Sequence, residues 1–168
     1  MADLERHPTA ATVEIAPIDP AHPTAQQCLR AYFAELDRRF ETGFDPALSI
    51  LPDAAQMRPP AGLFLGALLG GEPIGCGGLQ FHDGAPAYIK RMWVAGSARG
   101  IGVGRRLLTE LESQAAAHGA HAVQLETNNA LPEAISLYRS AGYLEVPPFN
   151  AEPYAHHWFE KQLAPTPR

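Results

Sequence analysis

Hydrophobic and polar residues follow two periods along this 168-residue chain, and their order predicts a mixed α/β fold. Stretches in which apolar and polar residues alternate between glycines and prolines are typical of strands. Stretches with an apolar residue at every third or fourth position are typical of amphipathic helices. The predicted strands are Thr12–Ile18, Gly62–Leu69, Pro73–Phe81, Ala87–Val94, His121–Thr127, Tyr143–Val146 and Tyr154–Leu163. The predicted helices are Thr24–Phe40, Val103–His118 and Pro132–Ala141, and residues 42–60 are expected to form a loop or a broken second helix.

The order of these elements predicts how the strands pair. Gly70-Gly71-Glu72 separates two apolar strands, an arrangement typical of a β-hairpin. The strands up to Val94 are therefore expected to form an antiparallel meander. Strand His121–Thr127 follows a helix, so it is expected to run parallel to strand Ala87–Val94. The predicted fold class is α/β, with a mixed sheet of about six to seven strands.

Length and composition narrow the class of protein. A chain with 46% hydrophobic and 18% charged residues suits a single domain, expected over residues 12–163 with disordered ends at 1–11 and 164–168. The net charge of −5 does not support a nucleic-acid-binding surface. No apolar run approaches the roughly 20 residues that cross a bilayer, and no signal peptide is recognised. Cys28 and Cys76 are predicted to be buried free thiols rather than a disulfide or metal site, so a cytoplasmic protein is expected.

The run Arg99-Gly-Ile-Gly-Val-Gly104 lies between a predicted strand and a predicted helix. Its three glycines let backbone N–H groups approach an anion closely, and a helix N-terminus adds unpaired donors and partial positive charge. These features predict a phosphate-binding turn, with a tight strand-to-helix connection as the alternative. The run lacks the Lys-Ser/Thr ending of a Walker motif. It also lacks the third glycine of a dinucleotide fingerprint, but Glu126 lies where that fingerprint expects an acidic residue, so this rival is weakened rather than removed.

Together with its neighbours, this run resembles the GNAT superfamily of acetyl-CoA-dependent N-acetyltransferases. It matches the R/Q-x-x-G-x-G/A signature of that superfamily, and KRMWV, LLTELE, QLET and PEAISLYRSAGY fall around it in the expected order and spacing. The resemblance covers residues 60–163 well and the N-terminal third more loosely. It implies a GNAT-like mixed sheet with helices on both faces, in which the central parallel strands splay apart to hold acetyl-CoA as the cosubstrate.

The resemblance also implies which residues hold acetyl-CoA. Backbone groups of Met92, Trp93 and Val94 would pair with the pantetheine arm like an added strand. Tyr138 would lie near the sulfur and protonate the leaving thiolate, a role that suits a tyrosine hydroxyl. The structural alternative for Tyr138 is an inward aromatic residue on an amphipathic helix. The pyrophosphate would be held by Arg99, Gly100, Ile101, Gly102, Val103, Gly104 and Arg105.

Direct transfer to an amine needs a group that removes a proton from the amine. Glu126, at the end of a strand beside the expected cleft, is the leading candidate, with a structural carboxylate as the alternative. Two departures from the superfamily keep this assignment open: Tyr88 stands where many relatives carry a glutamate, and Leu131 where many carry an asparagine. No metal site is predicted. The other candidates for the base are a water chain and the histidines His82, His118, His121, His156 and His157.

The acceptor site is expected in the N-terminal third, where the resemblance is least specific. Tyr32 and Phe44 are the candidate substrate residues, and a plain packing role is the alternative for each. Asp37, Arg39 and Asp45 lie nearby and are weaker candidates.

The resemblance implies an N-acetyltransferase that moves an acetyl group to a primary amine of a small or amino-acid-like molecule. No nucleic-acid or membrane partner is expected. A non-catalytic acyl-CoA-binding module and a nucleotide-binding regulatory domain are the alternatives. A homodimer is plausible because Trp158 and Phe159 look like exposed apolar residues near the C-terminus.

Overall fold

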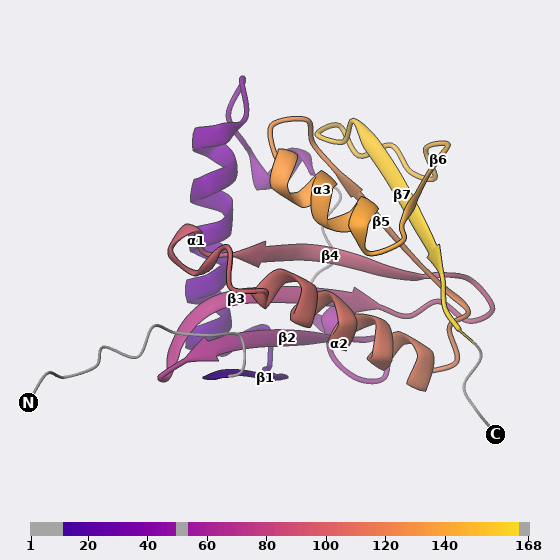
Figure 1. The fold of residues 1–168 in the computed structure, drawn as a ribbon, viewed down its shortest axis with the longest axis horizontal. Coiled ribbons are helices and arrows are strands. Elements are labelled where there is room, and N and C mark those ends of the chain that lie inside the picture. The colour runs from indigo at the N-terminus through magenta and orange to yellow at the C-terminus, as the bar shows by residue number, and fades with distance from the viewer. Residues whose placement is uncertain (1–11, 50–53, 165–168) are drawn as a thin grey trace, which may run out of the picture.

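The computed structural model describes residues 12–49 and 54–164, whose strands form one mixed seven-stranded sheet (Figure 1). The strands lie in the order β1-β2-β3-β4-β5-β7-β6. The first four are antiparallel neighbours, β4 and β5 run parallel, and β7 lies antiparallel between β5 and β6. The strands are β1 (Val13–Pro17), β2 (Gly62–Leu69), β3 (Glu72–Gln80), β4 (Ala87–Val94), β5 (Ala122–Thr127), β6 (Leu144–Val146) and β7 (His157–Gln162).

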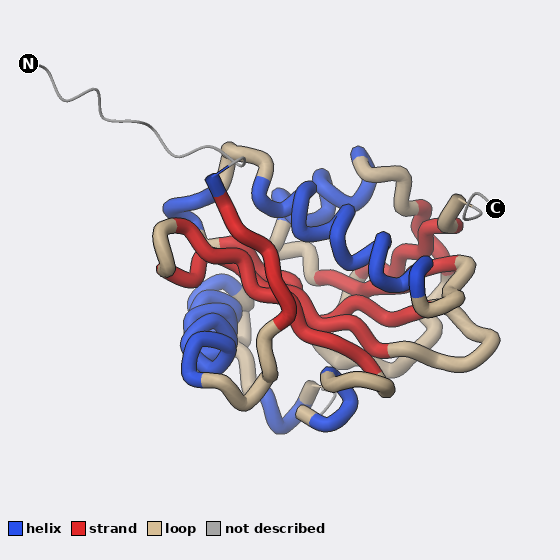
Figure 2. Tube along the Cα trace, turned by 90° about the horizontal axis from the view of Figure 1, so that it is seen from below, coloured by secondary structure: helices blue, strands red, loops and turns tan. Residues whose placement is uncertain are grey.

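Helices cover both faces of the sheet (Figure 2). Cys28 of the first helix shares an apolar cluster with Cys76 of β3, whereas a Cβ at Gly77 would lie 2.7 Å from Leu111 of the second helix. Consecutive strand residues point to opposite faces, so these two helices lie on opposite sides of β3. The third helix lies on the same side as the second, because its Tyr138 joins the apolar cluster of Leu111. The helices are α1 (Pro23–Arg39), α2 (Val103–Ala117) and α3 (Pro132–Ser140).

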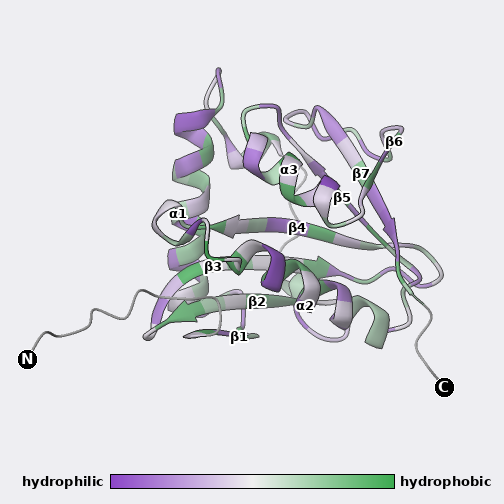
Figure 3. Cartoon of the chain, in the orientation of Figure 1, coloured by the Kyte–Doolittle hydropathy of each residue, from purple (hydrophilic) through white to green (hydrophobic). Residues whose placement is uncertain are grey.

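Amphipathic helices fix this arrangement. In Figure 3, bands of apolar and polar colour alternate along α1 and α2, which is how helices with one apolar face appear. The apolar positions of α2 are buried at 1% exposure or less, and they face a core that includes Val123 and Leu125 of β5. This apolar face of α2 consists of Leu107, Leu108, Leu111 and Ala115.

The central parallel strands separate along their length. Pairing between β4 and β5 is confined to Ala87 with Val123 and Tyr88 with Gln124, although both strands continue. Beyond this point the described residues of β4 and β5 form no further ladder pairs. The splayed pair that the resemblance implied is therefore confirmed.

A bulge in β4 lies beside the opening. Cys76 of β3 pairs with Trp93 and Gly78 pairs with Lys90, so β4 has one residue more than β3 in this interval. Arg91 adopts a left-handed φ of 58° within it. A bulge bends and twists a strand, and such bulges occur often beside active sites.

The predicted hairpin, meander and parallel crossover are confirmed, but the last strand begins later than predicted. Residues 154–156 precede β7, because Tyr154 is held in a turn by contacts with other segments. Its carbonyl accepts a hydrogen bond from Asn128 Nδ2 at 2.7 Å, and its hydroxyl accepts one from the N–H of Asp45 at 2.9 Å. Within residues 42–60, the structure has two short 3-10 turns, at Pro46–Leu48 and Ala55–Met57, and no α-helix in the part that it describes.

The sequence suggested a homodimer because Trp158 and Phe159 looked exposed, and this expected exposure is wrong. Phe159 is 0% exposed in the core, and Trp158 is half-buried, with its indole N–H donating to Asn150 Oδ1 at 2.9 Å. Strand β7 pairs with β5 on one side and with β6 on the other. This pairing does not test whether the protein forms a homodimer, so the homodimer stays a prediction.

Other predictions about the whole chain have mixed outcomes. Cys28 and Cys76 are buried free thiols, as predicted. The single domain over residues 12–163 stays a prediction, and the predicted disordered ends lie outside the described residues apart from Ala164. In residues 12–49 and 54–164, no helix has the length and apolar character needed to cross a membrane. The cytoplasmic location also stays a prediction.

Candidate functional site

The glycine run folds as a sharp turn because two of its glycines adopt backbone angles that other residues avoid. Gly100 has a φ of +87° and Gly102 a φ of +83°, both in the left-handed region. Gly102 is the N-cap of α2, so the turn leads directly to the unpaired N–H groups of that helix. Gly104 allows close packing, since a Cβ there would lie 3.1 Å from Leu137 of α3. The run thus combines an anion-binding geometry with close contact between α2 and α3.

A groove with about 950 Å³ of empty space runs from this turn along the unpaired part of β4, and we call it the loop groove. Its lining brings together residues of β4, the glycine run, α1 and α3. Ile101 does not line it, because its side chain packs beside Val103 in an apolar cluster. The predicted cofactor-binding residues that do line it are Met92, Trp93, Val94, Arg99, Gly100, Gly102, Val103, Gly104, Arg105 and Tyr138.

Charged side chains join the elements around the loop groove. Arg99 Nη2 donates to both carboxylate oxygens of Glu35, each at 2.8 Å, and Glu35 also accepts a hydrogen bond from Trp93 Nε1 at 3.1 Å. Arg105 Nη2 donates to Ser140 Oγ at 2.6 Å. These contacts connect α1 and α3 to the glycine run. They also place two guanidinium groups at the groove, where an anionic ligand would meet them.

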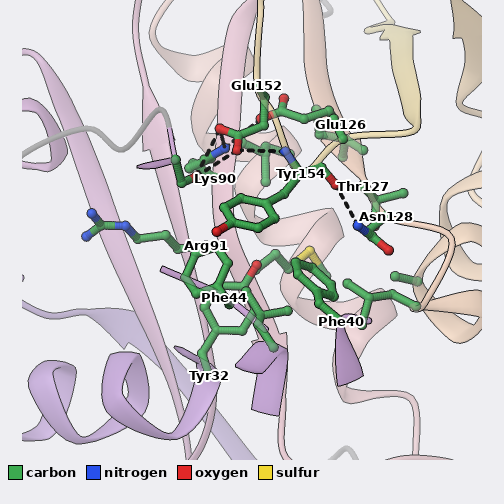
Figure 4. Close-up of a pocket in the computed structure, with 18 of the residues that line it drawn as sticks. Tyr32, Phe40, Phe44, Lys90, Arg91, Glu126, Thr127, Asn128, Glu152 and Tyr154 are labelled. Carbon is green, nitrogen blue, oxygen red and sulfur yellow. Dashed lines mark hydrogen bonds and ion pairs between the residues drawn. The ribbon is translucent and has the colours of Figure 1, made fainter. Parts of the chain in front are cut away.

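A second pocket, with about 680 Å³ of space between its atoms that includes open solvent, adjoins the loop groove. We call it the carboxylate pocket, because Glu126 and Glu152 line it (Figure 4). The two cavities share residues of α1, β4 and α3, so a ligand in one can reach a ligand in the other. The shared lining residues are Tyr32, Leu36, Met92, Leu131, Ala134 and Tyr138.

Tyr138 lies where the two cavities meet. It is on the inner face of α3, as predicted, and is 6% exposed. Burial, followed by the negative charge of Glu126, raises the pKa of Tyr138 above its ordinary value. The hydroxyl therefore keeps its proton through neutral pH and can donate it to an anion that forms beside it.

Glu126 lies within the carboxylate pocket with its side chain 3% exposed. Its Oε1 accepts hydrogen bonds from Lys90 Nζ at 2.6 Å and from the hydroxyl of Tyr88. Its Oε2 is buried and has no hydrogen-bond partner in the described part of the chain. Tyr88, which stands where many relatives carry a glutamate, thus contacts the predicted base. The burial of Tyr88 and the charge of Glu126 raise the pKa of that tyrosine.

Glu152 is a second carboxylate that sequence analysis missed. It comes from the segment between β6 and β7, and its side chain is also 3% exposed. Lys90 Nζ lies 3.2 Å from its Oε2, and Ser49 Oγ donates to its two oxygens at 2.9 Å. No local pattern signals this cluster, because 62 residues separate Lys90 from Glu152.

Six aromatic residues line the pocket, and we call the four that gather around Phe44 the aromatic wall: Phe33, Phe40, Phe44 and Tyr154. The ring centroid of Phe44 lies 5.4 Å from that of Phe33, 5.9 Å from Phe40 and 4.9 Å from Tyr154. Tyr32 lies beside Phe33 and lines both cavities. Both predicted acceptor residues, Tyr32 and Phe44, are therefore in the pocket.

The weaker candidates have structural contacts instead. Asp37 Oδ1 accepts the N–H of Phe44 at 2.9 Å, and the Asp45 side chain caps a short 3-10 turn. Arg39 pairs with Glu133 of α3. None of the five candidate histidines lines either cavity. Within the described ranges, the structure has no group of three or more His, Cys, Asp or Glu residues that could hold a metal ion.

Comparison with known proteins decides the family. The family model described as "Acetyltransferase (GNAT) family" matches residues 27–143, more than half of the chain. The chain belongs to the GNAT acetyltransferase family. A relative named "IAA acetyltransferase", from Azospirillum brasilense, is 36% identical to this GNAT chain over 116 residues, which are 68% of this chain and 76% of the relative.

Solved GNAT structures share the fold. A GNAT-family acetyltransferase of Staphylococcus aureus Mu50 superposes with a TM-score of 0.76 at 17% identity, over 90% of this chain and 99% of its own. An aminoglycoside 6'-N-acetyltransferase crystallised with coenzyme A superposes with a TM-score of 0.67 at 19% identity, over 92% of this chain and 99% of its own. The GNAT fold predicted from the sequence is confirmed, and acetyl-CoA is the typical cosubstrate of this family.

Proposed function

We propose that this GNAT acetyltransferase moves the acetyl group of acetyl-CoA to a primary amine of a small molecule. The observation that carries the proposal is the meeting of the two cavities at Tyr138. The loop groove offers a helix N-terminus and the guanidinium group of Arg105 to an anionic donor, whereas Arg99 there is paired with Glu35. The carboxylate pocket offers the unpartnered Oε2 of Glu126 to a cationic acceptor. The relative named "IAA acetyltransferase" supports a small molecule as the acceptor.

In this proposal the loop groove holds acetyl-CoA. Met92, Trp93 and Val94 offer backbone groups that β5 leaves unpaired, so the pantetheine arm pairs with β4 as an added strand. Backbone N–H groups across Arg99–Gly104 bind the pyrophosphate at the N-terminus of α2. Arg105 lines the same groove and adds positive charge.

Glu126 acts as the general base and Tyr138 as the general acid. Oε2 of Glu126 accepts one proton from the ammonium group of the acceptor, which leaves a neutral amine. The amine nitrogen then attacks the thioester carbonyl carbon, so a C–N bond forms and the C–S bond breaks. Tyr138 donates its proton to the leaving sulfur, and the surplus proton on nitrogen restores the tyrosine hydroxyl. Glu126 afterwards releases its proton to solvent.

Replacement of Tyr138 by phenylalanine tests the acid. Tyr138→Phe should lower kcat about a hundredfold or more, because general acid catalysis contributes about 10²–10⁴-fold. The Kd for acetyl-CoA should stay within about twofold, because the backbone and arginine contacts of the loop groove remain. Thiol release measures kcat, and calorimetry measures the Kd.

Tyr143→Phe is the matched control. Tyr143 is a second buried tyrosine, but its hydroxyl donates to Glu112 at 2.9 Å and it lines neither cavity. This control should lose stability and keep its kcat. An unchanged kcat in Tyr138→Phe would remove Tyr138 from the mechanism. Tight binding of acetyl-CoA without transfer to any amine would favour the non-catalytic acyl-CoA-binding module.

A further inference from the structure

Lys90, Glu126 and Glu152 form a charged cluster in the carboxylate pocket, and this cluster has one net negative charge. Two carboxylates, Glu126 and Glu152, contact the single ammonium group of Lys90. Both carboxylates are 3% exposed and Lys90 is 13% exposed, so water and salt screen them weakly. A buried polar atom without a hydrogen-bond partner is unfavourable. A ligand that donates a hydrogen bond to the free Oε2 of Glu126 would therefore be stabilised in the pocket. One ammonium group would supply both the donor and the missing positive charge.

Glu152 is held between this charged cluster and the aromatic wall. Ser49 Oγ donates to its carboxylate, and the N–H of Tyr154 lies 3.3 Å from its Oε1. Tyr154 also contributes its ring to the wall, 4.9 Å from Phe44. An acceptor whose ammonium group contacts Glu126 and Glu152 therefore has aromatic rings beside the rest of the molecule (Figure 4).

The aromatic wall is suited to a ring. Phe44 is within 6 Å of each of the other three rings, from centroid to centroid, and both Phe33 and Phe44 keep part of their surface accessible. Aromatic pairs stabilise one another beyond the burial of their area. A short amine without a ring would leave this apolar surface uncovered.

The cationic residue Arg91 also lines the pocket, and it contacts the aromatic wall. Its Cζ lies 5.6 Å from the ring centroid of Phe33. Figure 4 shows its guanidinium group pointing away from Lys90 and the two carboxylates. A carboxylate next to an amine that is bound at Glu126 and Glu152 would lie close to these two carboxylates, which repel it.

We propose that the acceptor is a monoamine with an aromatic or similarly bulky apolar body and no carboxylate beside its amine. Phe44 and Glu152 are the residues that select it: Phe44 through the ring and Glu152 through the charge. This inference rests on the proposed function, because it concerns the acceptor pocket of the same site. It narrows the acceptor from small amines in general to one chemical class.

A set of four probes tests the class on the unmodified protein. 2-Phenylethylamine combines the ammonium group and the ring, ethylamine lacks the ring, phenylalanine adds a carboxylate, and 3-phenylpropionate replaces the ammonium group by a carboxylate. The kcat/KM for 2-phenylethylamine should exceed that for ethylamine and that for phenylalanine by about tenfold or more each. Calorimetry in the presence of CoA should show binding of 2-phenylethylamine and none of 3-phenylpropionate at the same concentration.

Two variants separate the contributions of ring and charge. Phe44→Ala should lower kcat/KM for 2-phenylethylamine about tenfold, with a smaller loss for ethylamine. Glu152→Gln keeps the volume and the contact with Ser49, so it should raise KM for 2-phenylethylamine about tenfold with little change in kcat. The same variant should reduce the discrimination against phenylalanine, an effect that a merely structural role would not produce.

Glu112→Gln is the matched control for Glu152→Gln. Glu112 is also a partly buried carboxylate, with Lys161 Nζ at 2.8 Å and a tyrosine hydroxyl at 2.9 Å, but it lines neither cavity. It should change the melting temperature without changing the order of preference among the amines.

The possible outcomes separate this inference from the proposed function. Acetylation with equal preference for the three amines, or with phenylalanine preferred, would overturn the inference and leave the proposed function standing. Selective binding of 2-phenylethylamine without acetyl transfer would support the inference and contradict the function. Absence of both binding and transfer would overturn both.

Discussion

Tyr138 and Tyr143 show how position decides the role of a buried side chain. Burial raises the pKa of both hydroxyls, and a nearby carboxylate raises each further. Tyr143 donates its proton to Glu112 in a hydrogen bond that joins two elements of the fold. Tyr138 instead lines both cavities, so its proton is available where a thiolate would form.

The pKa of Tyr138 predicts the pH dependence of turnover. Because this pKa is raised above its ordinary value of about 10, Tyr138 stays protonated throughout the neutral and mildly alkaline range. At saturating acceptor, kcat should therefore show no descending limb between pH 7 and about pH 10. Circular dichroism over the same range controls for unfolding. A fall in kcat with a midpoint below about pH 9, absent from Tyr138→Phe, would contradict this assignment.

The residues of the site differ in how far the sequence reveals them. Tyr138 and Glu126 could be predicted because each occupies a recognisable place on one helix or one strand, although their roles remain proposals. Ser49, Lys90 and Glu152 could not be predicted as a cluster, because only the folded chain brings them together. In the sequence, Tyr88 was a departure from the superfamily that kept the assignment of the base open, whereas in the structure it donates a hydrogen bond to Glu126.

At the scale of elements, the glycine run and the β2–β3 hairpin both place glycine where the backbone adopts a left-handed conformation. Gly100 has a φ of +87° and Gly71 a φ of +84°, and a Cβ at either position would meet no atom within 4 Å. Only Gly100 lines the loop groove. The pair therefore separates backbone strain from ligand binding.

Gly100→Ala and Gly71→Ala should lose similar stability, because a left-handed conformation costs a non-glycine residue about 1–2 kcal/mol. Each melting temperature should fall by a few degrees. Only Gly100→Ala should weaken acetyl-CoA binding, by about tenfold or more, because the added methyl group occupies the surface that faces the pyrophosphate. Equal Kd values for acetyl-CoA in the two variants would show that the glycine run does not bind the pyrophosphate.

Elements with strong local signals were predictable, and their ends were less so. The hairpin, the glycine run and the proline at the start of α3 are encoded by neighbouring residues. The start of β7 depends on Tyr154, which contacts Asn128 and Asp45 from distant segments. The sequence around Tyr154 does not reveal those distant contacts. The last strand was therefore predicted to begin at Tyr154, three residues before β7 begins.

At the scale of the whole molecule, α1 joins the carboxylate pocket to the loop groove. It contributes lining residues to both cavities, Glu35 pairs with Arg99 of the glycine run, and Arg39 pairs with Glu133 of α3. Arg39 also donates to the carbonyl of Ala130 at 2.9 Å. The N-terminal third, where the family resemblance is loosest, is thus attached to the most recognisable part of the chain. Its aromatic residues line the carboxylate pocket.

Identification of the product tests acetyl transfer itself. The protein is incubated with acetyl-CoA and a panel of primary amines that includes 2-phenylethylamine, and mass spectrometry is combined with thiol detection. The proposal predicts one N-acetylated amine for each CoA thiol released, and neither product without an acceptor. Binding of acetyl-CoA without acetylation of any amine, or thiol release at the same rate without an acceptor, would contradict an N-acetyltransferase.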